Sequence, residues 1–520
     1  MMVEPTARRR ALILAICCLS LLIVGMDATI VNVALPAIRA ELHSGVSGLQ
    51  WVIDAYTLTL ASLLLLSGST ADRIGRRRTF QIGLVSFTAG SLLCSLAPTL
   101  QLLIIARIIQ AVGGSMLNPV AMSIITNVFR EPRERAKAIG IWGGVVGISM
   151  GLGPVLGGVL IQTVGWRWIF WINVPIGVAA IVLAGIFVPG SKAPTARRLD
   201  PLGQILVIAV LGGSTYAIVE SGRLGLSSVL LWSIIVAAAV ALAAFLAHER
   251  RRIEPLLDLR FFSSAPFSGA TVIAICAFGG YAGFLFLNSL YLQEVRGFSA
   301  LQAGVTVLPM AIMTMIWAPV SGRLVAAGKA RLALIAAGAA MTIGAVGLTA
   351  ITATTSVPYL IGCYVVFAIG FGLVNAPITN TAVSGMPLSQ AGVAAAVAST
   401  SRQVGATLGV AVIGSVLAAG TVPAGGGSEI ANQIGGILRN GETVWWIVAG
   451  CGVAVAALGV LTNGPWARAT AVRTARLTAP DLDSRTSSPD GGLCSRSPEQ
   501  PSTTTGRRRS RVGRSRSLRR

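Results

Sequence analysis

The chain has 520 residues, of which 54% are hydrophobic and only 12% charged, and its mean hydropathy is +0.75. Soluble domains of ordinary composition carry about 25% charged residues, roughly twice this share. The composition therefore excludes a string of soluble domains and indicates an all-α polytopic membrane protein. Sixty glycines supply the small side chains that let helices approach closely in lipid.

The net charge of +22 at pH 7 follows the loops of a membrane protein and does not indicate nucleic-acid binding. A helix of about 20 apolar residues can cross a bilayer. The sequence contains fourteen such segments: 11–35, 50–70, 79–98, 101–126, 136–162, 168–188, 202–221, 228–248, 267–291, 301–325, 331–353, 357–378, 391–419 and 444–464. The N-terminus and the loops on its side, with the adjoining span ends, hold 21 Lys and Arg, against 5 on the other side. This asymmetry predicts a multi-pass protein of the cell membrane with both termini in the cytoplasm.

The predicted spans fall into two halves. The loop after the second span, residues 68–78, has a weak counterpart after the tenth, residues 322–331, as expected if spans 7 and 8 are an insertion. Parallel halves with a substrate site between them are a transporter architecture. We therefore expect a cytoplasmic N-terminus (1–10), an N-terminal six-helix half (11–188), two additional helices (202–248), a C-terminal six-helix half (267–464) and a basic disordered cytoplasmic tail (465–520).

The loop after the second span carries a specific motif, GSTADRIGRRR, with Gly68, Asp72, Arg73, Gly75 and Arg76. The glycines allow close helix approach and a tight turn, and Asp72 is placed to pair with Arg73 or Arg76. The motif resembles the loop signature between spans 2 and 3 of the major facilitator superfamily. Residues 11–464 as a whole resemble its fourteen-span drug:proton antiporter branch. The resemblance implies the major facilitator fold, with two six-helix halves, two central extra helices and a cytoplasmic ion-pair latch.

The fifth span carries a second motif, made of Gly147, Gly151, Gly153, Pro154, Gly157 and Gly158. Glycines at intervals of about four residues form a smooth face for close helix packing, and Pro154 permits a kink. We predict a bendable helix at the interface between the halves, suited to rocking between inward- and outward-facing states. The run resembles the span 5 motif of exporters in the family. Ordinary glycine-rich packing is the alternative.

Charged residues inside the predicted spans are few, and each is a candidate for function. Arg107 in span 4 requires an interior partner, because a buried arginine in lipid costs about 2.5 kcal/mol or more. Asp27 lies about 12 Å and Arg107 about 9 Å from the outer ends of their spans, so the two are predicted to pair. Asp54 lies only about 6 Å deep, where an interfacial acid is the alternative. The resemblance implicates Arg107 in proton coupling, and we predict Asp27, Arg107 and Asp54 as the coupling residues.

Other polar residues in the spans have less specific interpretations. We predict that a substrate cavity is lined by Gln110, Asn32, Arg402 and Tyr281. For Arg402, pairing with an acid remains open as well. Glu220 and Glu294 fall at outer span ends, where we expect them to be solvated. The run 166–175 also resembles the family, but we interpret it as an aromatic belt at the membrane surface.

The sequence contains no constellation typical of an enzyme. Two His and seven Cys without a CxxC pair exclude a recognisable metal cluster, and the lack of a Walker-type loop argues against ATP as the energy source. We therefore predict a monomeric transporter without catalytic residues, metal or cofactor. Its partners are a small-molecule drug or antibiotic, protons and the lipid bilayer, with no nucleic acid. The leading hypothesis is proton-coupled export of amphipathic drugs or antibiotics by alternating access; the alternative is a proton-coupled importer of a small metabolite.

Overall fold

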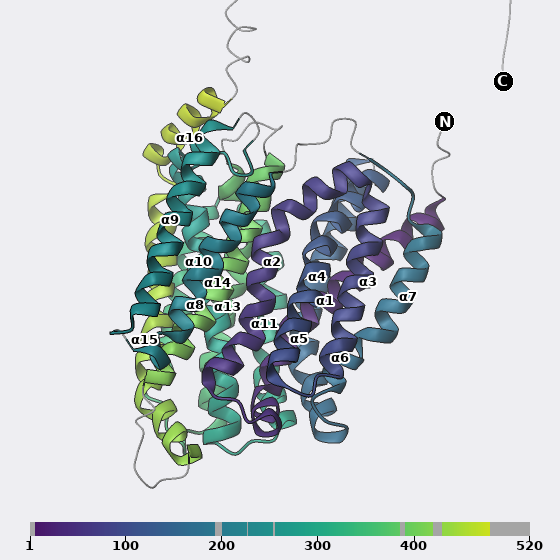
Figure 1. Cartoon of the computed structure of the whole chain (residues 1–520). Coiled ribbons are helices and arrows are strands. Elements are labelled where there is room, and N and C mark those ends of the chain that lie inside the picture. Colours follow the sequence, from purple (N-terminus) through teal and green to yellow (C-terminus); the bar gives the residue numbers. More distant parts are fainter. Residues whose placement is uncertain are drawn as a thin grey trace, which may run out of the picture. The chain divides into compact units, whose positions relative to one another are not determined.

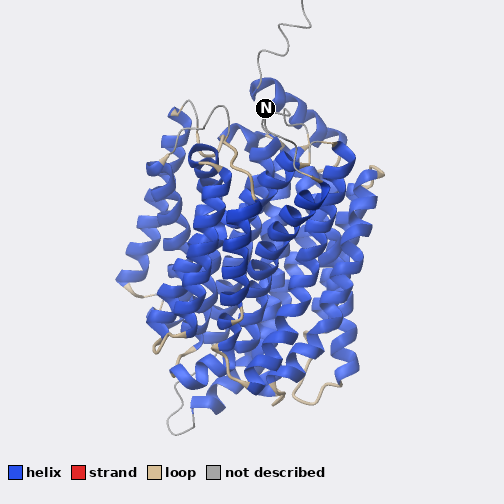
Figure 2. Ribbon diagram, turned by 90° about the vertical axis from the view of Figure 1, so that its right-hand side faces the viewer, coloured by secondary structure: helices blue, strands red, loops and turns tan. Residues whose placement is uncertain are grey.

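The computed structural model describes residues 6–129, 131–192, 200–225, 227–252, 255–384, 391–419 and 429–478. All regular elements within these residues are helices (Figure 2). Thirteen segments are long and apolar enough to cross a membrane, which confirms the all-α polytopic class. The remaining predicted span, 79–98, corresponds to a 20-residue helix, α3 (Arg76–Ser95), that is less apolar than the others. The count of fourteen spans therefore stays a prediction.

Residues up to 187 form a first group of helices (Figure 1). It consists of α1 (Ala7–Leu42), α2 (Val46–Ile74), α3, α4 (Leu100–Val128), α5 (Pro132–Thr163), the single turn α6 (Trp168–Trp171) and α7 (Asn173–Phe187). Helix α1 begins where the Thr6 hydroxyl accepts a hydrogen bond from the Arg9 N–H, and it ends at His43, in the left-handed conformation. It runs through Pro36 and ends seven residues beyond the predicted span 11–35.

A second group of helices follows residue 258. It consists of η1 (Leu259–Ser263), α10 (Ala265–Leu290), the π-turn η2 (Tyr291–Val295), α11 (Ala300–Ala326), α12 (Ala330–Gly347), α13 (Val357–Val383), α14 (Ala391–Ala419), α15 (Glu429–Leu461) and α16 (Pro465–Thr478). The turn between α11 and α12 contains Gly328 with φ of +73°, and the turn between α2 and α3 contains Gly75 with φ of +103°. Glycine tolerates this left-handed region without a steric penalty. The two turns occupy equivalent places in the two groups, as the weak sequence repeat predicts.

Of the two additional helices, α8 (Pro201–Leu224) contacts both α2 and α14, and α9 (Val229–Arg251) packs on α8 at the left edge of the view in Figure 1. In α8, the Gln204 side chain donates to the Ser62 carbonyl of α2 at 2.6 Å. Further along, the Ile218 carbonyl accepts from the Ser415 hydroxyl of α14. Helix α8 thus contacts both the N-terminal and the C-terminal group.

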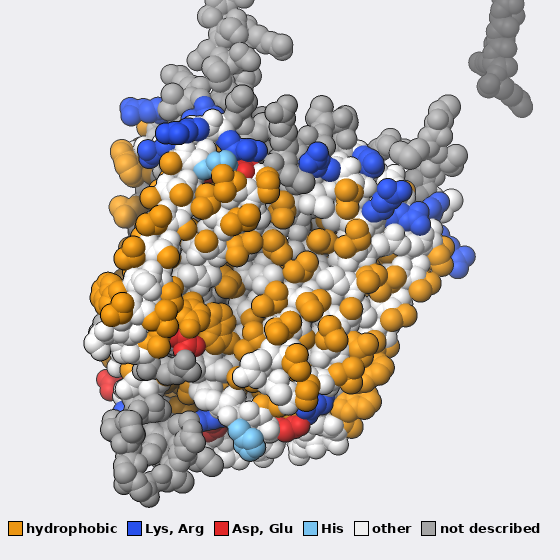
Figure 3. Space-filling model, in the orientation of Figure 1, with side chains coloured by type: hydrophobic (Ala, Val, Ile, Leu, Met, Phe, Trp, Pro, Cys, Tyr) orange, Lys and Arg blue, Asp and Glu red, His pale blue; other side chains and the backbone are white. Residues whose placement is uncertain are grey.

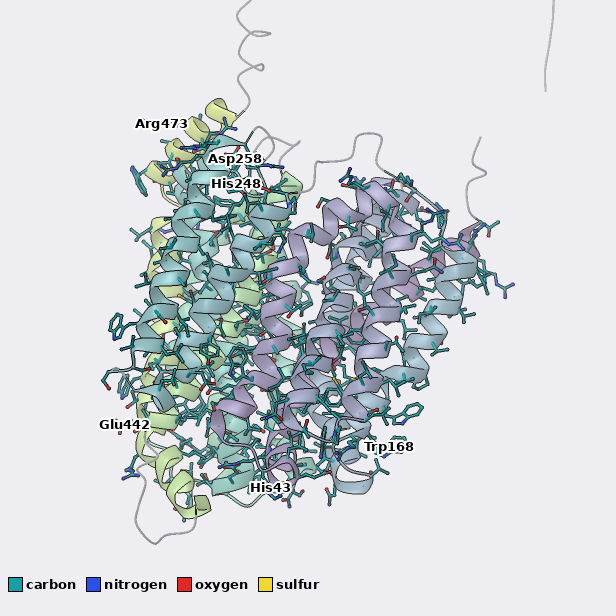
Figure 4. All side chains as sticks on the ribbon, in the orientation of Figure 1. His43, Trp168, His248, Asp258, Glu442 and Arg473 are labelled. Atoms are coloured by element: carbon teal, nitrogen blue, oxygen red, sulfur yellow. The ribbon has the colours of Figure 1, made fainter. Side chains whose placement is uncertain are left out.

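Most of the Lys and Arg side chains on the visible face gather at one end of the bundle (Figure 3). We call this the basic end; α1 begins there, and His248 and Asp258 lie there as well, whereas His43 lies at the opposite end (Figure 4). Hydrophobic side chains cover the surface between the two ends. This distribution is that of a bundle surrounded by lipid, with polar caps on both sides.

The two groups pack against each other toward the opposite end. One hydrophobic core there combines α1 side chains such as Ile30 and Leu35 with α10 side chains such as Phe286 and Leu290. Toward the basic end, a second core contains side chains from the N-terminal group alone, including Phe80. The groups therefore share a core at one end and are packed separately at the other.

The structure differs from two predicted boundaries. Helix α2 continues to Ile74, so most of the motif at residues 68–78 is helical and the turn is at Gly75. In the segment predicted to be a disordered tail, Pro465–Thr478 form α16, because its small Ala467 and Ala471 side chains are buried in contact with neighbouring helices. The predicted disorder of 480–520 concerns residues outside the described part of the chain.

Candidate coupling site and transport pathway

Asp27 of α1 and Arg107 of α4 form a buried ion pair. The Arg107 Nη1 lies 2.6 Å from the Asp27 Oδ2, and the two side chains are 0% and 2% exposed. The sequence analysis predicted this pair from the similar depth of the two residues in their spans. Helix α1, however, extends further beyond Asp27 than the predicted span does. Removing one partner of an ion pair that is this well shielded from water destabilises a protein by about 3–5 kcal/mol, because the remaining charge stays buried.

Hydrogen bonds satisfy most of the remaining polar atoms of the pair. The Gln110 side chain accepts from Arg107 Nη1 at 2.8 Å and donates to Asp27 Oδ1 at 2.8 Å, closing a triangle. Arg107 Nε donates to the Val52 carbonyl of α2 at 3.2 Å. Asn173 of α7 donates to Asp27 Oδ1 at 3.5 Å and to the Ser91 hydroxyl at 3.1 Å. The network joins α1, α2, α3, α4 and α7 around one carboxylate.

The Arg107 guanidinium also lies over aromatic rings. Its central carbon is 4.0 Å from the centre of the Tyr56 ring and 5.6 Å from that of Phe170. A cation over an aromatic face gains about 2 kcal/mol or more when water is excluded. The arginine is therefore held in place by a carboxylate, a backbone carbonyl and two rings.

Asp54 of α2 lies apart from this network. The residue is 0% exposed, and neither carboxylate oxygen has a hydrogen-bond partner among the described residues. The neighbouring turns of α2 pack on α14: Gln50 donates to the Ala411 carbonyl at 2.9 Å, and Thr57 and Thr407 share a hydrogen bond of 2.8 Å. Asp54 is thus buried at the junction of the two halves, which contradicts the alternative of a solvated interfacial acid.

The small residues of α5 divide between two neighbours. A Cβ added at Gly147, Gly151 or Gly158 would come within 3.2 Å of Met315, 3.1 Å of Ala311 or 2.6 Å of Leu301, all in α11. The Pro154 carbonyl abuts Gly304 of the same helix. Gly153 and Gly157 instead face α1, at Thr29 and Ile30. The expected interface between the halves is therefore made by the first face only, and Gly157 belongs to packing inside the N-terminal half.

The close approach of α5 to α11 does not extend to three glycines nearer the basic end. Nothing described lies within 4 Å of a Cβ added at Gly140 or Gly144 of α5, or at Gly322 of α11. At the opposite end, polar bonds join the halves: Gln293 donates to the Val33 carbonyl at 3.0 Å, and Ser289 donates to the carbonyl of Asn32. The packing thus tightens from the basic end toward the opposite end.

The motif at the basic end of α2 contains one weak ion pair. Arg76 lies 3.7 Å from Asp72, across the turn at Gly75, and this selects Arg76 over Arg73 as the partner. Nothing described lies within 4 Å of a Cβ added at Gly68. The pair joins α2 to α3 within one half, and its predicted role as a latch stays a prediction.

The four cavity candidates have different surroundings. Gln110 is part of the ion-pair network, and Asn32 lies at the contact between α1 and α10, where its side chain donates to the Ala28 carbonyl. Tyr281 of α10 stacks on Phe371 with ring centres 4.1 Å apart. Arg402 of α14 donates to Thr379 and Asn375 of α13. Only the last two remain candidates for a cavity in this conformation.

Sequence reasoning missed several polar contacts. Asn173 lies within the run interpreted as an aromatic belt, although a lone amide between apolar residues is itself a sign of an interior partner. Glu220 and Glu294 are not solvated as expected; Glu220 is 7% exposed and accepts from the Trp51 indole at 3.1 Å. Glu294 pairs with Arg39. Whether an acidic side chain at a helix end faces water or protein depends on the neighbouring helix, which the sequence does not identify.

Comparisons with known proteins agree with this geometry. Residues 17–410 match the profile of the family described as Major Facilitator Superfamily. The multidrug resistance protein Stp of Mycobacterium tuberculosis is 36% identical over 401 residues, covering 77% of this chain and 74% of that protein. The tetracenomycin C resistance and export protein of Streptomyces glaucescens is 32% identical over 402 residues, covering 76% and 74%. A solved bacterial homologue of the human lysosomal transporter Spinster, inward-facing and unoccupied, is similar in fold, with a TM-score of 0.63 and 17% identity over 90% of this chain and 99% of that one.

Proposed function

The chain belongs to the major facilitator superfamily, and from this premise we propose that it exports drugs or antibiotics across the cell membrane in exchange for protons. Members of the family are transport proteins and not enzymes. The export direction is supported by two relatives that each match about three quarters of this chain. One is named as a multidrug resistance protein and the other as an antibiotic resistance and export protein. Those relatives favour export over the import of a small metabolite.

The buried ion pair of Asp27 and Arg107 is the observation that carries the proton coupling. In the present arrangement Asp27 has the Arg107 cation at 2.6 Å and accepts a hydrogen bond from Gln110. If α1 and α4 separate, the carboxylate loses its cation, meets water and takes a proton. Return to the paired arrangement releases that proton. A carboxyl that alternates between these two environments couples proton entry to drug exit without any covalent step.

The tightening of the packing from one end to the other supports alternating access. With the basic end in the cytoplasm, as the positive-inside rule requires, the present conformation is closed toward the outside. The smooth contact of Gly147, Gly151 and Gly158 with α11 is suited to act as the pivot about which the halves rock. In the outward-facing state, the bonds of α1 with α10 and η2 would open and the basic ends of α5 and α11 would meet.

Asp54 is the second candidate for a proton. A carboxylate buried with neither a cation nor a hydrogen-bond donor is costly, so in this conformation Asp54 would be protonated. Movement of α2 along α14 would expose it to a different environment. A second carrier at the interface between the halves would allow more than one proton per cycle.

Expression in a pump-deficient bacterium tests the export function. Cells with the wild-type protein should accumulate less of several amphipathic drugs than cells with the empty vector, and a protonophore should remove the difference. Proteoliposomes then isolate the coupling: drug movement should follow an imposed pH gradient. Unchanged accumulation across a broad drug panel, at confirmed membrane abundance, would contradict drug export.

A further inference from the structure

Arg402 is a cation inside the bundle without a carboxylate partner among the described residues. It lies 11 residues into α14, about 17 Å along the helix from the basic end. Its Nη2 donates to the Thr379 hydroxyl at 2.6 Å and to the Asn375 carbonyl at 3.3 Å, both in α13. Its Nε is buried and has no partner in the described residues. Neutral acceptors therefore satisfy only one edge of the guanidinium.

Such an arginine differs sharply from Arg107. Arg107 has Asp27 beside it, whereas no described acid lies within ion-pair distance of Arg402. A charged side chain within a membrane bundle is costly, and arginines retained there usually have a partner or face a functional cavity. The described part of the chain offers no acidic partner, so binding of an anion is one way to neutralise the site.

Asp54, the other buried ionisable residue without a described partner, does not occupy that place. It is on the side of α2 that packs against Thr407 and Ala411 of α14. With about 3.6 residues per turn, Arg402 points well away from that side of α14. Its own contacts are with α13 and with Phe278 of α10, whose ring centre is 5.7 Å from the guanidinium carbon.

A group of aromatic rings lies next to Arg402. Phe278 packs edge-on against Phe371 at 5.1 Å, and Tyr281, one turn further along α10, stacks on the same ring. Arg402, Phe278, Tyr281 and Thr379 all keep part of their surface accessible, whereas Phe284, one turn beyond, is fully buried. These side chains, on α10, α13 and α14, are therefore not fully enclosed by protein. The site offers one cation and a flat apolar wall.

We infer that Arg402 binds the acidic group of an aromatic organic anion, so that the substrates of this transporter include weak aromatic acids. A carboxylate or phenolate would accept from Nη1, for which the described residues give no bond, and the attached ring would lie against Phe278 and Tyr281. Charge-assisted hydrogen bonds of this kind are roughly twice as strong as those between neutral groups. The inference rests on the proposed export function and names the substrate class of the same pathway.

Two fluorescent probes with one ring system and opposite charge test this site. We would measure binding of anthracene-9-carboxylate and of 9-(aminomethyl)anthracene to the purified full-length protein. The wild type should bind the carboxylate more tightly. Arg402→Gln should weaken carboxylate binding at least tenfold and leave amine binding unchanged or stronger, while Arg402→Lys should retain part of the carboxylate affinity. The matched control is Arg331→Gln, which removes an exposed arginine of the same half and should change neither affinity.

Competition and transport separate the remaining explanations. If millimolar chloride or phosphate displaces the carboxylate probe and the isolated ring binds equally well, the site holds an inorganic anion and the inference is overturned. Equal binding of the carboxylate by wild type and a folded Arg402→Gln protein overturns it as well. The drug panel in the pump-deficient bacterium reports separately on export: if export is seen but the probes bind alike, the substrate class fails and the proposed function stands. If the probes bind selectively but no drug is exported, the anion site stands and the proposed function fails.

Discussion

Arg39 near the end of α1 and Glu294 in η2 form an ion pair of 2.8 Å that joins the N-terminal to the C-terminal half. Both Glu294 oxygens accept from the same Arg39 nitrogen, and both side chains are only 15% exposed. The pair lies at the end opposite the basic one, where the halves also share hydrophobic core. It must break whenever the halves separate at that end.

Arg39→Gln should therefore shift the conformational equilibrium toward opening at this end. A half-buried pair contributes about 1 kcal/mol, which corresponds to a roughly fivefold change in the population ratio. Spin labels at His43 and Ala353, in a background without native cysteines, would report the distance between the halves by pulsed electron resonance. Arg167→Gln is the matched control, because Arg167 pairs with Glu41 inside the N-terminal half. The prediction fails if both variants give the wild-type distance distribution.

Gly158→Ala should impair transport. Its Cβ would come 2.6 Å from the Leu301 Cα, a backbone atom that cannot turn aside, so α5 and α11 must move apart. Overpacking of this kind costs about 1–3 kcal/mol, and we expect efflux to fall about tenfold at unchanged abundance. Gly144→Ala in the same helix meets nothing within 4 Å and should export normally. Wild-type efflux by Gly158→Ala would remove this contact from the transport cycle.

Asp200 gives a pH-dependent contribution to the stability of α8 and α9. Burial raises its pKa, but the Gly203 N–H, His248 and Arg252 outweigh that effect and hold the pKa below its usual value. The stabilisation is therefore present above the unfolded pKa of about 3.9 and is lost as the pH falls through the lower folded value. Asp200→Asn keeps the helix cap but removes the charge. It should lower the thermal midpoint at pH 7, and this difference from wild type should shrink as the pH falls below the unfolded pKa of about 3.9.

The C-terminal segment should divide into a structural and a dispensable part. The Thr470 hydroxyl accepts from the Ala265 N–H at 3.0 Å, and α16 packs on α10 and η1. A stop after Gly464 removes these contacts and should lower the thermal midpoint in detergent. A stop after Pro480 should change neither stability nor drug accumulation. Loss of resistance on the second truncation, at normal abundance, would show that the basic tail takes part in transport.

Hydropathy and charge predict much of this architecture, because lipid requires long apolar helices and leaves few sites for charge. The pairing of Asp27 with Arg107 follows from the same constraint: two buried opposite charges at similar depth are cheapest together. Which helix each residue contacts is harder to predict. A glycine repeat marks smooth faces on α5 but does not say that Gly157 meets α1 while Gly158 meets α11. Helix α16 escapes prediction because alanines can bury a surface without giving strong apolar periodicity.

Asp27→Asn is the sharpest test of the coupling proposal. Asparagine keeps the size and the hydrogen-bonding capacity of the side chain but cannot exchange a proton, so pH-gradient-driven efflux from proteoliposomes should be abolished while drug binding persists. The variant also leaves Arg107 without its anion, and an orphaned buried charge costs about 3–5 kcal/mol. The double variant Asp27→Asn with Arg107→Gln removes both charges and should recover much of the lost stability without recovering transport. This combination separates a folding defect from a coupling defect.

Asp54→Asn should change stability little, since its carboxyl makes no described hydrogen bond, and should reduce efflux less than Asp27→Asn. If Asp27→Asn still drives gradient-dependent efflux at the wild-type rate, Asp27 is not the proton carrier, and the same measurement on Asp54→Asn decides whether Asp54 takes its place.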